Sequence, residues 1–293
     1  MHNIWQVRSV RDSLDHPECV AFGPSGRLYA GGEAGQVYQI DLNEGTCEEI
    51  ASTGGFVLGI AIDADENLYV CDMKKHSLVR VDSDDDRTVT TVCDRVEGKP
   101  LRFPNFCVFH PNGDLYLTDS GDYWHSSGRL IRLRPDGSSD SLLGERLSFP
   151  NGLALSADAK TLYMIESTSA RISRMTLGGD GSPDEPETYV QLQGSVVPDG
   201  MAFDLLGNLY VGCYAPDAIF KIDSERNVAA LIEDRTGEVL SRPSNVAFRP
   251  EKPTELYFAN IGGWHIGCLD VGSPGRPLNY PKVPRGARTD SRP

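Results

Sequence analysis

Short stretches of alternating hydrophobic and polar residues recur along the whole 293-residue chain, separated by turns rich in Pro, Asp, Asn and Gly. The alternation has the two-residue period of β-strands, and no apolar period of 3.6 residues persists for three helical turns. A typical unit opens with a short apolar strand such as Val20-Ala21-Phe22 and continues, after a turn, with a strand that carries a Leu-Tyr pair. A third, alternating strand and a fourth, more polar strand complete the unit. The pattern therefore predicts an all-β protein.

This unit occurs six times in the chain. The residues that open its first strands lie at positions 18, 58, 105, 151, 199 and 244, so that consecutive units are 40 to 48 residues apart. Four strands in a unit of this length are typical of a β-propeller blade, whereas the competing open β-solenoid usually has shorter repeats. We therefore predict a single domain over residues 1–281, a six-bladed β-propeller with four antiparallel strands per blade. The Leu-Tyr pairs mark the repeats: Leu28-Tyr29, Leu68-Tyr69, Leu115-Tyr116, Leu162-Tyr163, Leu209-Tyr210 and Leu256-Tyr257.

The two ends of the chain do not fit the repeat. The stretch from Trp5 to Val10 has strand character but belongs to no unit, and the sixth unit ends after its third strand, near Leu269. A ring of blades must close on itself, so we predict that the N-terminal stretch supplies the outer strand of the last blade. Residues 282–293 are predicted to form a loose C-terminal tail.

Composition excludes several classes of function. With 42 acidic and 28 basic residues the formal net charge is −14, which disfavours binding to the phosphate backbone of nucleic acids. The longest apolar runs are far shorter than the roughly 20 residues of a membrane-spanning helix, and the N-terminus lacks the layout of a signal peptide. The seven scattered cysteines form no C-x-x-C pair and are predicted to be free thiols. We therefore expect a cytoplasmic protein, either a monomer or a weak homodimer.

The repeat also places polar side chains in a ring. The first strand of a propeller blade is the innermost, and its leading end faces the central channel. Oxygen donors that converge there from several blades favour a hard divalent cation such as Ca²⁺, Mg²⁺ or Mn²⁺. Alternatively, Asn-Gly and Asp-Gly are common turn dipeptides, so these residues could simply punctuate the strands. The equivalent positions, which we call the first ring, are Glu18, Leu58, Asn105, Asn151, Asp199 and Ser244.

Three segments resemble a known family. They are Glu18 before Cys-Val-Ala-Phe, the Phe-Pro-Asn-Gly-Leu-Ala-Leu-Ser at 149–156, and the Val-Pro-Asp-Gly-Met-Ala-Phe-Asp at 197–204. From about residue 14 to 280 the chain is similar to the regucalcin (senescence marker protein), gluconolactonase and luciferin-regenerating-enzyme family. The resemblance implies a six-bladed propeller and a metal-dependent hydrolase that opens small-molecule lactones, most often sugar lactones.

The resemblance also implies roles for individual residues. By position, Glu18, Asn151 and Asp199 would bind one divalent cation, with Asp199 also acting as the base that works with a metal-held water. Asn105 would touch the substrate or the metal. The expected cation is Ca²⁺, with Zn²⁺, Mn²⁺, Mg²⁺ or Fe²⁺ as alternatives. The chain departs from many relatives where Phe106 follows Asn105 in place of an aspartate, a change that concerns the substrate pocket.

A second ring lies three residues past each Leu-Tyr tyrosine. Its member Asp119 heads the longest loop and is predicted to contact substrate hydroxyl groups. Arg102, just ahead of the third repeat, is predicted to contact a carboxylate or hydroxyl group of the substrate. An aspartate that ends a strand commonly makes a local turn instead. The second ring consists of Gly32, Asp72, Asp119, Glu166, Cys213 and Asn260.

Three functions are consistent with these patterns. The leading one is a metal-dependent lactonase, and the absence of a G-x-S-x-G motif agrees with chemistry that needs no serine nucleophile. The histidines show no H-x-x-x-H spacing, which disfavours a structural zinc site. The second function keeps the cation but cleaves an aryl ester or organophosphate. The third is a non-enzymatic binding propeller with a structural cation.

Overall fold

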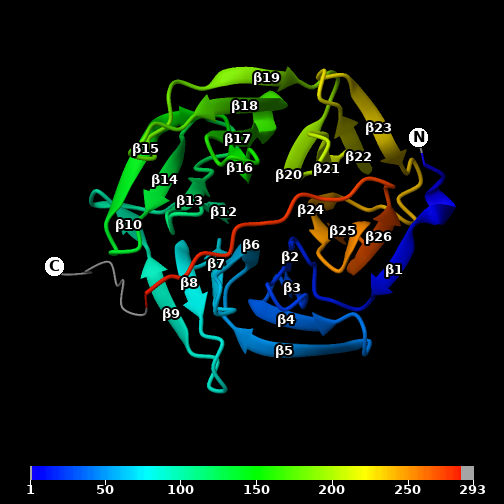
Figure 1. The fold of residues 1–293 in the computed structure, drawn as a ribbon, viewed down its shortest axis with the longest axis horizontal. Coiled ribbons are helices and arrows are strands. Elements are labelled where there is room, and N and C mark those ends of the chain that lie inside the picture. Colours follow the sequence, from blue (N-terminus) through cyan, green and yellow to red (C-terminus); the bar gives the residue numbers. More distant parts are fainter. Residues whose placement is uncertain (1, 285–293) are drawn as a thin grey trace.

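Six four-stranded antiparallel sheets are arranged around a central channel (Figure 1) in the computed structural model, which describes residues 2–284. The predicted six-bladed propeller is thereby confirmed. From the channel outward, blade one consists of β2 (Val20–Phe22), β3 (Leu28–Gly31), β4 (Gln36–Asp41) and β5 (Thr46–Ser52). Blade two consists of β6 (Val57–Ile62), β7 (Leu68–Asp72), β8 (Ser77–Val81) and β9 (Val89–Cys93). Blade three consists of β12 (Pro104–Phe109), β13 (Leu115–Asp119), β14 (Gly128–Leu133) and β15 (Ser139–Leu147).

The remaining blades follow the same order, with a small hairpin inserted between blades two and three. The hairpin consists of β10 (Arg95–Val96) and β11 (Lys99–Pro100). Blade four consists of β16 (Pro150–Leu155), β17 (Thr161–Glu166), β18 (Arg171–Thr176) and β19 (Glu187–Gln191). Blade five consists of β20 (Val197–Phe203), β21 (Leu209–Ala215), β22 (Ala218–Ile222) and β23 (Val228–Glu233). Blade six consists of β24 (Pro243–Arg249), β25 (Lys252–Asn260), β26 (His265–Asp270) and β1 (Arg8–Arg11).

The N-terminal strand closes the ring, as predicted. β1 pairs antiparallel with β26, and the Arg8 guanidinium also reaches Glu255 of the neighbouring strand at 2.8 Å. The strand begins later than Trp5 because the 3₁₀ turn η1 (Ile4–Gln6) precedes it, capped by the side chain of Asn3. The last blade is therefore built from both ends of the chain.

The Leu-Tyr pairs build the hydrophobic cores between the blades. Successive side chains of a strand point to opposite faces of the sheet, so the two members of each pair enter different cores. Leu28 packs in the core between the last blade and the first, together with Tyr257, whereas Tyr29 packs with Leu68 between the first blade and the second. The same alternation continues around the ring, with the leucine facing the preceding blade and the tyrosine the following one.

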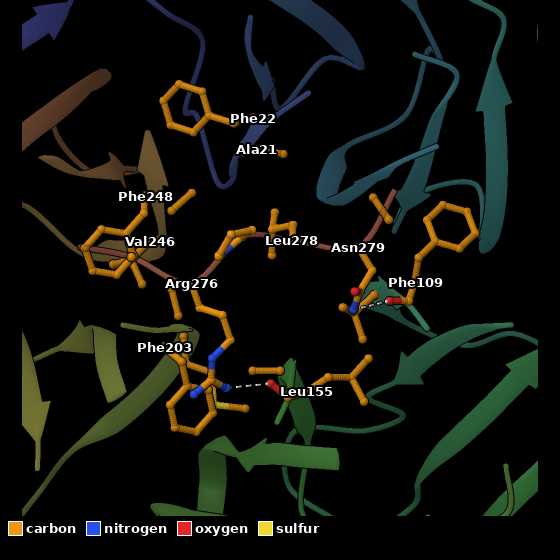
Figure 2. Close-up of a pocket in the computed structure, with 18 of the residues that line it drawn as sticks. Ala21, Phe22, Phe109, Leu155, Phe203, Val246, Phe248, Arg276, Leu278 and Asn279 are labelled. Atoms are coloured by element: carbon orange, nitrogen blue, oxygen red, sulfur yellow. Dashed lines mark hydrogen bonds between the residues drawn. The ribbon is translucent and has the colours of Figure 1, made fainter. Parts of the chain in front are cut away.

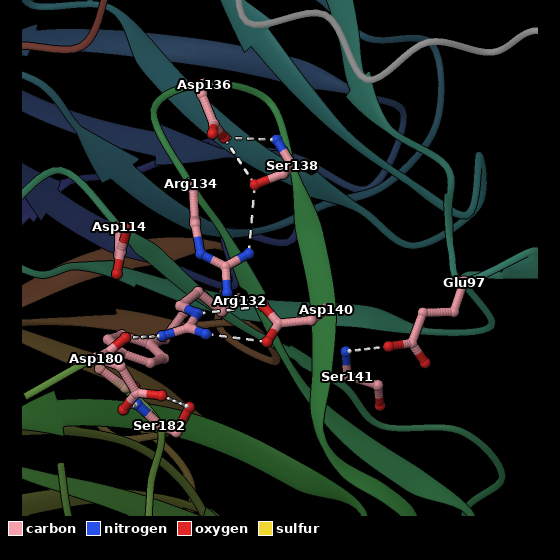
Figure 3. Close-up of polar contacts among 12 residues, drawn as sticks. Glu97, Asp114, Arg132, Arg134, Asp136, Ser138, Asp140, Ser141, Asp180 and Ser182 are labelled. Carbon is pink, nitrogen blue, oxygen red and sulfur yellow. Dashed lines mark hydrogen bonds and ion pairs between the residues drawn. The ribbon is translucent and has the colours of Figure 1, made fainter. Parts of the chain in front are cut away.

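Polar contacts add a specific link between blades three and four (Figure 3). The side chain of Arg132 is buried, and its Nε and Nη2 donate to Asp140 at 3.2 and 2.9 Å. Its Nη1 donates to the carbonyl of Asp180, in the loop that joins β18 to β19. The hydroxyl of Tyr116 donates to the carbonyl of the next residue, Gly181, at 2.7 Å. Two side chains of blade three thus hold a loop of blade four.

A C-terminal segment crosses the end of the channel at which the inner strands finish (Figure 1). We call residues 272–281 the strap. It forms hydrogen bonds with all six blades, and several use the carbonyl of the last inner-strand residue. The partners are Phe22, Ala64, Phe109, Leu155, Phe203, Leu205 and Pro253. Lys282–Pro284 have no regular secondary structure, and the rest of the predicted loose tail lies outside the described residues.

All seven cysteines are free thiols, as the sequence predicts; six are buried and Cys47 is half-buried. Among residues 2–284 there is no helix of the length and hydropathy needed to cross a bilayer.

The contact of the strap with blade six predicts an effect on stability. A Cβ on Gly275 would lie 1.9 Å from Cγ of Phe248, so Gly275→Ala forces the strap away from the blade. We expect the variant to lose about 1–3 kcal/mol of unfolding free energy, as overpacked sites do. Gly179→Ala is the matched control, because a Cβ there meets nothing within 4 Å. Urea unfolding measures both, and equal stabilities would contradict a tightly seated strap.

Candidate metal centre

The first ring lies at the mouth of the channel opposite the strap, where the inner strands begin. The residue just before the ring position pairs with the second-ring residue of the same blade in five blades. In blade one the strand begins only at Val20, but its pairing of Ala21 with Tyr29 matches that of Ala61 with Tyr69 in blade two, so the repeats share one register. The five pairs of the other blades are Val57 with Asp72, Pro104 with Asp119, Pro150 with Glu166, Pro198 with Cys213, and Pro243 with Asn260.

A β-bulge occurs at the ring position of each of these five strands. In blade four, Pro150 pairs with Glu166 and Leu153 with Met164. The inner strand has two residues between its paired positions and the second strand has one, so the inner strand carries one extra residue. Such bulges redirect side chains and are frequent beside functional sites. Asn151 and Asp199 lie inside strands β16 and β20, so the interpretation of Asn-Gly and Asp-Gly as turns is wrong.

The glycines after these two residues allow neighbouring inner strands to approach closely. A Cβ on Gly152 would lie 2.6 Å from the carbonyl oxygen of Asp199, and one on Gly200 would lie 2.9 Å from that of Ser244. Only glycine fits such an approach of backbone to backbone. The hydroxyl of Ser244 in turn donates to the carbonyl of Glu18 at 2.6 Å. The structure thus brings together residues of the first ring from blades four, five, six and one.

Two serines orient the carboxamides of the ring. Nδ2 of Asn105 donates to Ser120 Oγ at 3.0 Å, and Nδ2 of Asn151 donates to Ser167 Oγ at 3.3 Å. Each serine hydroxyl also donates to a carbonyl of the next blade, at 2.6 and 2.7 Å. With its nitrogen engaged, Asn105 keeps its Oδ1 buried and without a hydrogen-bond partner among the described residues.

Sequence reasoning missed these two serines. A signal for them exists, because each directly follows the acidic residue of the second ring in its own blade, in the dipeptides Asp119-Ser120 and Glu166-Ser167.

The two carboxyl groups of the ring are buried and interact. Glu18 is 8% and Asp199 is 7% exposed. Burial raises the pKa of Glu18 well above its usual range, and the charge of Asp199 raises it further. Burial also raises the pKa of Asp199 to about 7, against the opposing effect of a hydrogen bond from Asn151. Two such groups require a shared proton or a cation at neutral pH.

The donor set fits a hard cation. No three His, Cys, Asp or Glu side chains form a metal-binding group within residues 2–284, so a site rich in nitrogen or sulfur ligands is not present there. The mouth instead offers carboxylates from Glu18 and Asp199 and carboxamides from Asn105 and Asn151, of which Asn105 Oδ1 is buried and has no partner among residues 2–284. Oxygen ligands with two negative charges suit Ca²⁺ and Mg²⁺. The residues present therefore fit the expected divalent ion.

The predicted substrate residue Asp119 is occupied by protein contacts. It is 1% exposed, and its Oδ2 accepts from Nε and Nη2 of Arg129 at 3.1 and 2.5 Å. Its Oδ1 accepts from the backbone N–H groups of Arg102 and Phe103 at 3.0 and 2.6 Å. The carboxylate thereby fixes the segment that leads into β12 and Asn105. The side chain of Arg102 is exposed, and substrate contact by either residue stays a prediction.

Other carboxylates of the second ring behave in the same way. Glu166 accepts from Arg171 and from the backbone of Ser148, just before β16. Asp72 accepts from the backbone of Phe56, just before β6. The carboxylates of the second ring thus fix, by hydrogen bonds to backbone N–H groups, the segments that lead into the inner strands. Their effect on the mouth is transmitted by the backbone of these segments.

The raised pKa of Asp199 predicts how stability depends on pH when no divalent cation is present. Its pKa rises from 3.8 to about 7 on folding, so the folded state binds more protons between these values and loses stability as pH increases through them. We expect chelator-treated protein to be less stable at pH 8 than at pH 5. Added Ca²⁺ should reduce the loss, and Asp199→Asn should diminish it. Urea unfolding tests this, with the exposed Asp85→Asn as control; the same pH dependence in all three proteins would contradict the assignment.

The contacts of Asp119 predict that it is structural. Asp119→Asn leaves Arg129 as an uncompensated buried charge, and we expect a loss of about 3–5 kcal/mol in unfolding free energy. Glu145→Gln removes only an exposed ion pair with Lys99 and should leave the unfolding free energy almost unchanged. A variant at position 119 with unchanged stability and a raised KM would instead indicate direct substrate contact.

Known proteins share this architecture and parts of this sequence. The chain is similar to a gluconolactonase of Zymomonas mobilis, with 30% identity over 202 residues that make up 62% of this chain and 56% of that protein. Two solved structures share the fold. A gluconolactonase from Xanthomonas campestris superposes with a TM-score of 0.76 at 22% identity, covering 92% of this chain and 89% of that one. A calcium-binding protein, regucalcin from Agrobacterium tumefaciens, gives 0.78 at 17%, covering 94% and 97%.

Two family models match different parts of the chain. A strictosidine synthase-like N-terminal model matches residues 11–40. The model of the SMP-30/gluconolactonase/LRE-like region matches residues 33–261, which is well over half of the chain and includes five of the six first-ring positions. The chain belongs to the SMP-30/gluconolactonase/LRE-like family.

Proposed function

We propose that this protein is a divalent-metal-dependent hydrolase that opens lactones, with sugar (aldono-) lactones as its substrates. The observation that carries the proposal is the buried set of oxygen donors at the channel mouth, Glu18, Asn151 and Asp199, beside the unpartnered Oδ1 of Asn105. The names of the relatives support a lactone substrate, and the calcium-binding regucalcin supports Ca²⁺ as the ion. A cytoplasmic location belongs to the same proposal and is supported by the seven free thiols.

Glu18, Asn151 and Asp199 would hold the cation. When bound, it supplies positive charge that polarises a lactone carbonyl and makes a nearby water more acidic. Burial excludes bulk water from the carboxylates and strengthens their attraction for that charge. The serine behind Asn151 keeps the carboxamide in place without adding charge, so the negative charge of the ligands comes from Glu18 and Asp199 alone.

Asp199 would act as the base. Its carboxylate takes a proton from the attacking water, the hydroxide oxygen forms a bond to the carbonyl carbon, and the ring C–O bond of the lactone breaks. The proton then passes to the departing ring oxygen, so that the product is an open hydroxy acid. Asn105 Oδ1 would accept from, and the exposed Arg102 would donate to, substrate hydroxyl groups.

One observation favours a second candidate, an esterase with aryl substrates. Phe103 and Phe149 each lie two residues before an asparagine of the ring, and their rings are 5.2 Å apart. Tyr123 stacks edge-on against Phe149 at 5.0 Å. Phe149 has a φ of 55°, an uncommon value for an aromatic residue. An aryl group would pack on the exposed Tyr123 and the half-buried Phe103, with the buried Phe149 behind them.

Hydrolysis assays test the proposal. We expect turnover of glucono-1,5-lactone that is abolished by EDTA and restored by Ca²⁺ or another divalent ion. Removal of a general base costs about 10²–10⁴ in rate, so Asp199→Asn should lower kcat by that factor while the exposed Asp85→Asn retains full activity.

Comparison with phenyl acetate separates the two enzymatic candidates, since faster turnover of the ester would favour the esterase. Lactone hydrolysis that persists in metal-free protein, or an Asp199→Asn variant with full activity, would refute the proposed mechanism.

A further inference from the structure

The channel contains a second chemical environment at the end opposite the metal centre. Between the inner strands and the strap lies a cavity of about 670 Å³ (Figure 2). This volume falls within the range of small-molecule binding sites. Apolar residues at the ends of the inner strands provide most of the lining, among them Phe22, Phe109, Leu155 and Phe203. Glu18, Asn105, Asn151 and Asp199 do not line the cavity, although Phe106 and Asn245, each one residue past a ring position, do.

Arg276, a charged residue of the strap, lines this largely apolar cavity. Its side chain is half-buried, with the guanidinium 4.6 Å from the centre of the Phe203 ring. One Nη donates to the carbonyl of Leu155 at 3.1 Å, whereas Nε is buried and has no hydrogen-bond partner in the described part of the chain. Burial lowers the pKa of Arg276, which reflects the loss of solvation.

Arg276 also has no ion-pair partner in the described part of the chain, although the charges of Asp204 and Asp158 act on it from farther away. The buried arginines Arg129, Arg132 and Arg249 each form an ion pair with a carboxylate, but no ion pair of Arg276 occurs within residues 2–284. The nearby Asp204 is already engaged, because its carboxylate accepts hydrogen bonds from Asn208 and Tyr210. A desolvated guanidinium without an anion is unfavourable, and its fork of N–H groups matches a carboxylate.

We propose that this cavity binds a medium-chain aliphatic carboxylate, with the carboxylate on the Arg276 guanidinium and the acyl chain in the apolar end of the channel. A chain of about eight carbons is of suitable size for the cavity. Sugar acids, the products of the proposed reaction, carry many hydroxyl groups that would lose their hydrogen bonds to water against this lining. The site is therefore distinct from the metal centre in both position and ligand chemistry, and it does not depend on the proposed function.

Ligand binding should also be linked to stability, because the strap holds all six blades. A molecule that contacts Arg276 and the inner strands together stabilises the closed arrangement by mass action. Leu278, which is 50% exposed on the strap beside the cavity, offers apolar surface for the acyl chain to cover (Figure 2).

Octanoate is the probe for calorimetric titration and thermal unfolding. We expect saturable binding with one site per chain and a raised Tm for the native protein. Arg276→Met should weaken binding at least tenfold, and Arg276→Lys should restore part of it, because the charge returns without the fork. Arg226→Met is the matched control. Like Arg276, Arg226 lies over an aromatic ring, that of Tyr189 at 5.6 Å, but it is exposed on another part of the surface.

Two further ligands, the neutral 1-octanol and the polar gluconate, test the proposal on the native protein. These tests remain possible even if Arg276→Met does not fold. 1-Octanol should bind at least tenfold more weakly than octanoate, and gluconate should not compete with octanoate. Asp199→Asn should bind octanoate like the native protein. Octanoate affinity that is unchanged by Arg276→Met, equalled by 1-octanol, or lost in Asp199→Asn would overturn the proposal.

Discussion

The close approach of neighbouring inner strands at the channel mouth is the constraint on which the site depends. Gly152 and Gly200 leave no room for a Cβ against the backbone of the next blade, and Ser244 bonds to the backbone of Glu18. These contacts bring donors from separate blades into one small ring. If the strands stood farther apart, the carboxylates would be solvated separately and would lose their mutual influence on pKa. Packing between blades therefore determines the electrostatics of the mouth.

The same geometry lowers the stability of the folded state at neutral pH. Two buried carboxyl groups with raised pKa values oppose folding at neutral pH unless a positive ion or a proton accompanies them. The second ring offsets part of this cost by a different route, because its carboxylates are paired with arginines or backbone N–H groups. Asp119 and Glu166 of the second ring are thus paired with arginines, whereas Glu18 and Asp199 at the mouth have no such cationic partner among the described residues. Such contrast is typical of functional sites.

Much of the fold was predictable because each repeat carries the same Leu-Tyr pair, and a two-residue period assigns its members to opposite faces. The six positions of the first ring followed from the repeat register, whereas the choice of Glu18, Asn151 and Asp199 among them as ligands came from the family resemblance. The partner of Asp119 could not be read in this way, since Arg129 lies on the next strand and nothing in the spacing marks the pair. The strap was also missed, because a segment rich in Pro and Gly has no periodic pattern and its contacts use backbone carbonyls of distant blades.

The closure of the last blade has a consequence for how the molecule forms. β1 pairs with β26, so its residues must find partners more than 250 positions away, as with Arg8 and Cys268. Contacts of such large sequence separation form slowly, since a long loop must be ordered before they contribute. We therefore expect β1 to stay unpaired until the blades formed by strands close in sequence have assembled. During that interval β26 presents an open sheet edge, which makes the unclosed ring the state most exposed to association with other chains.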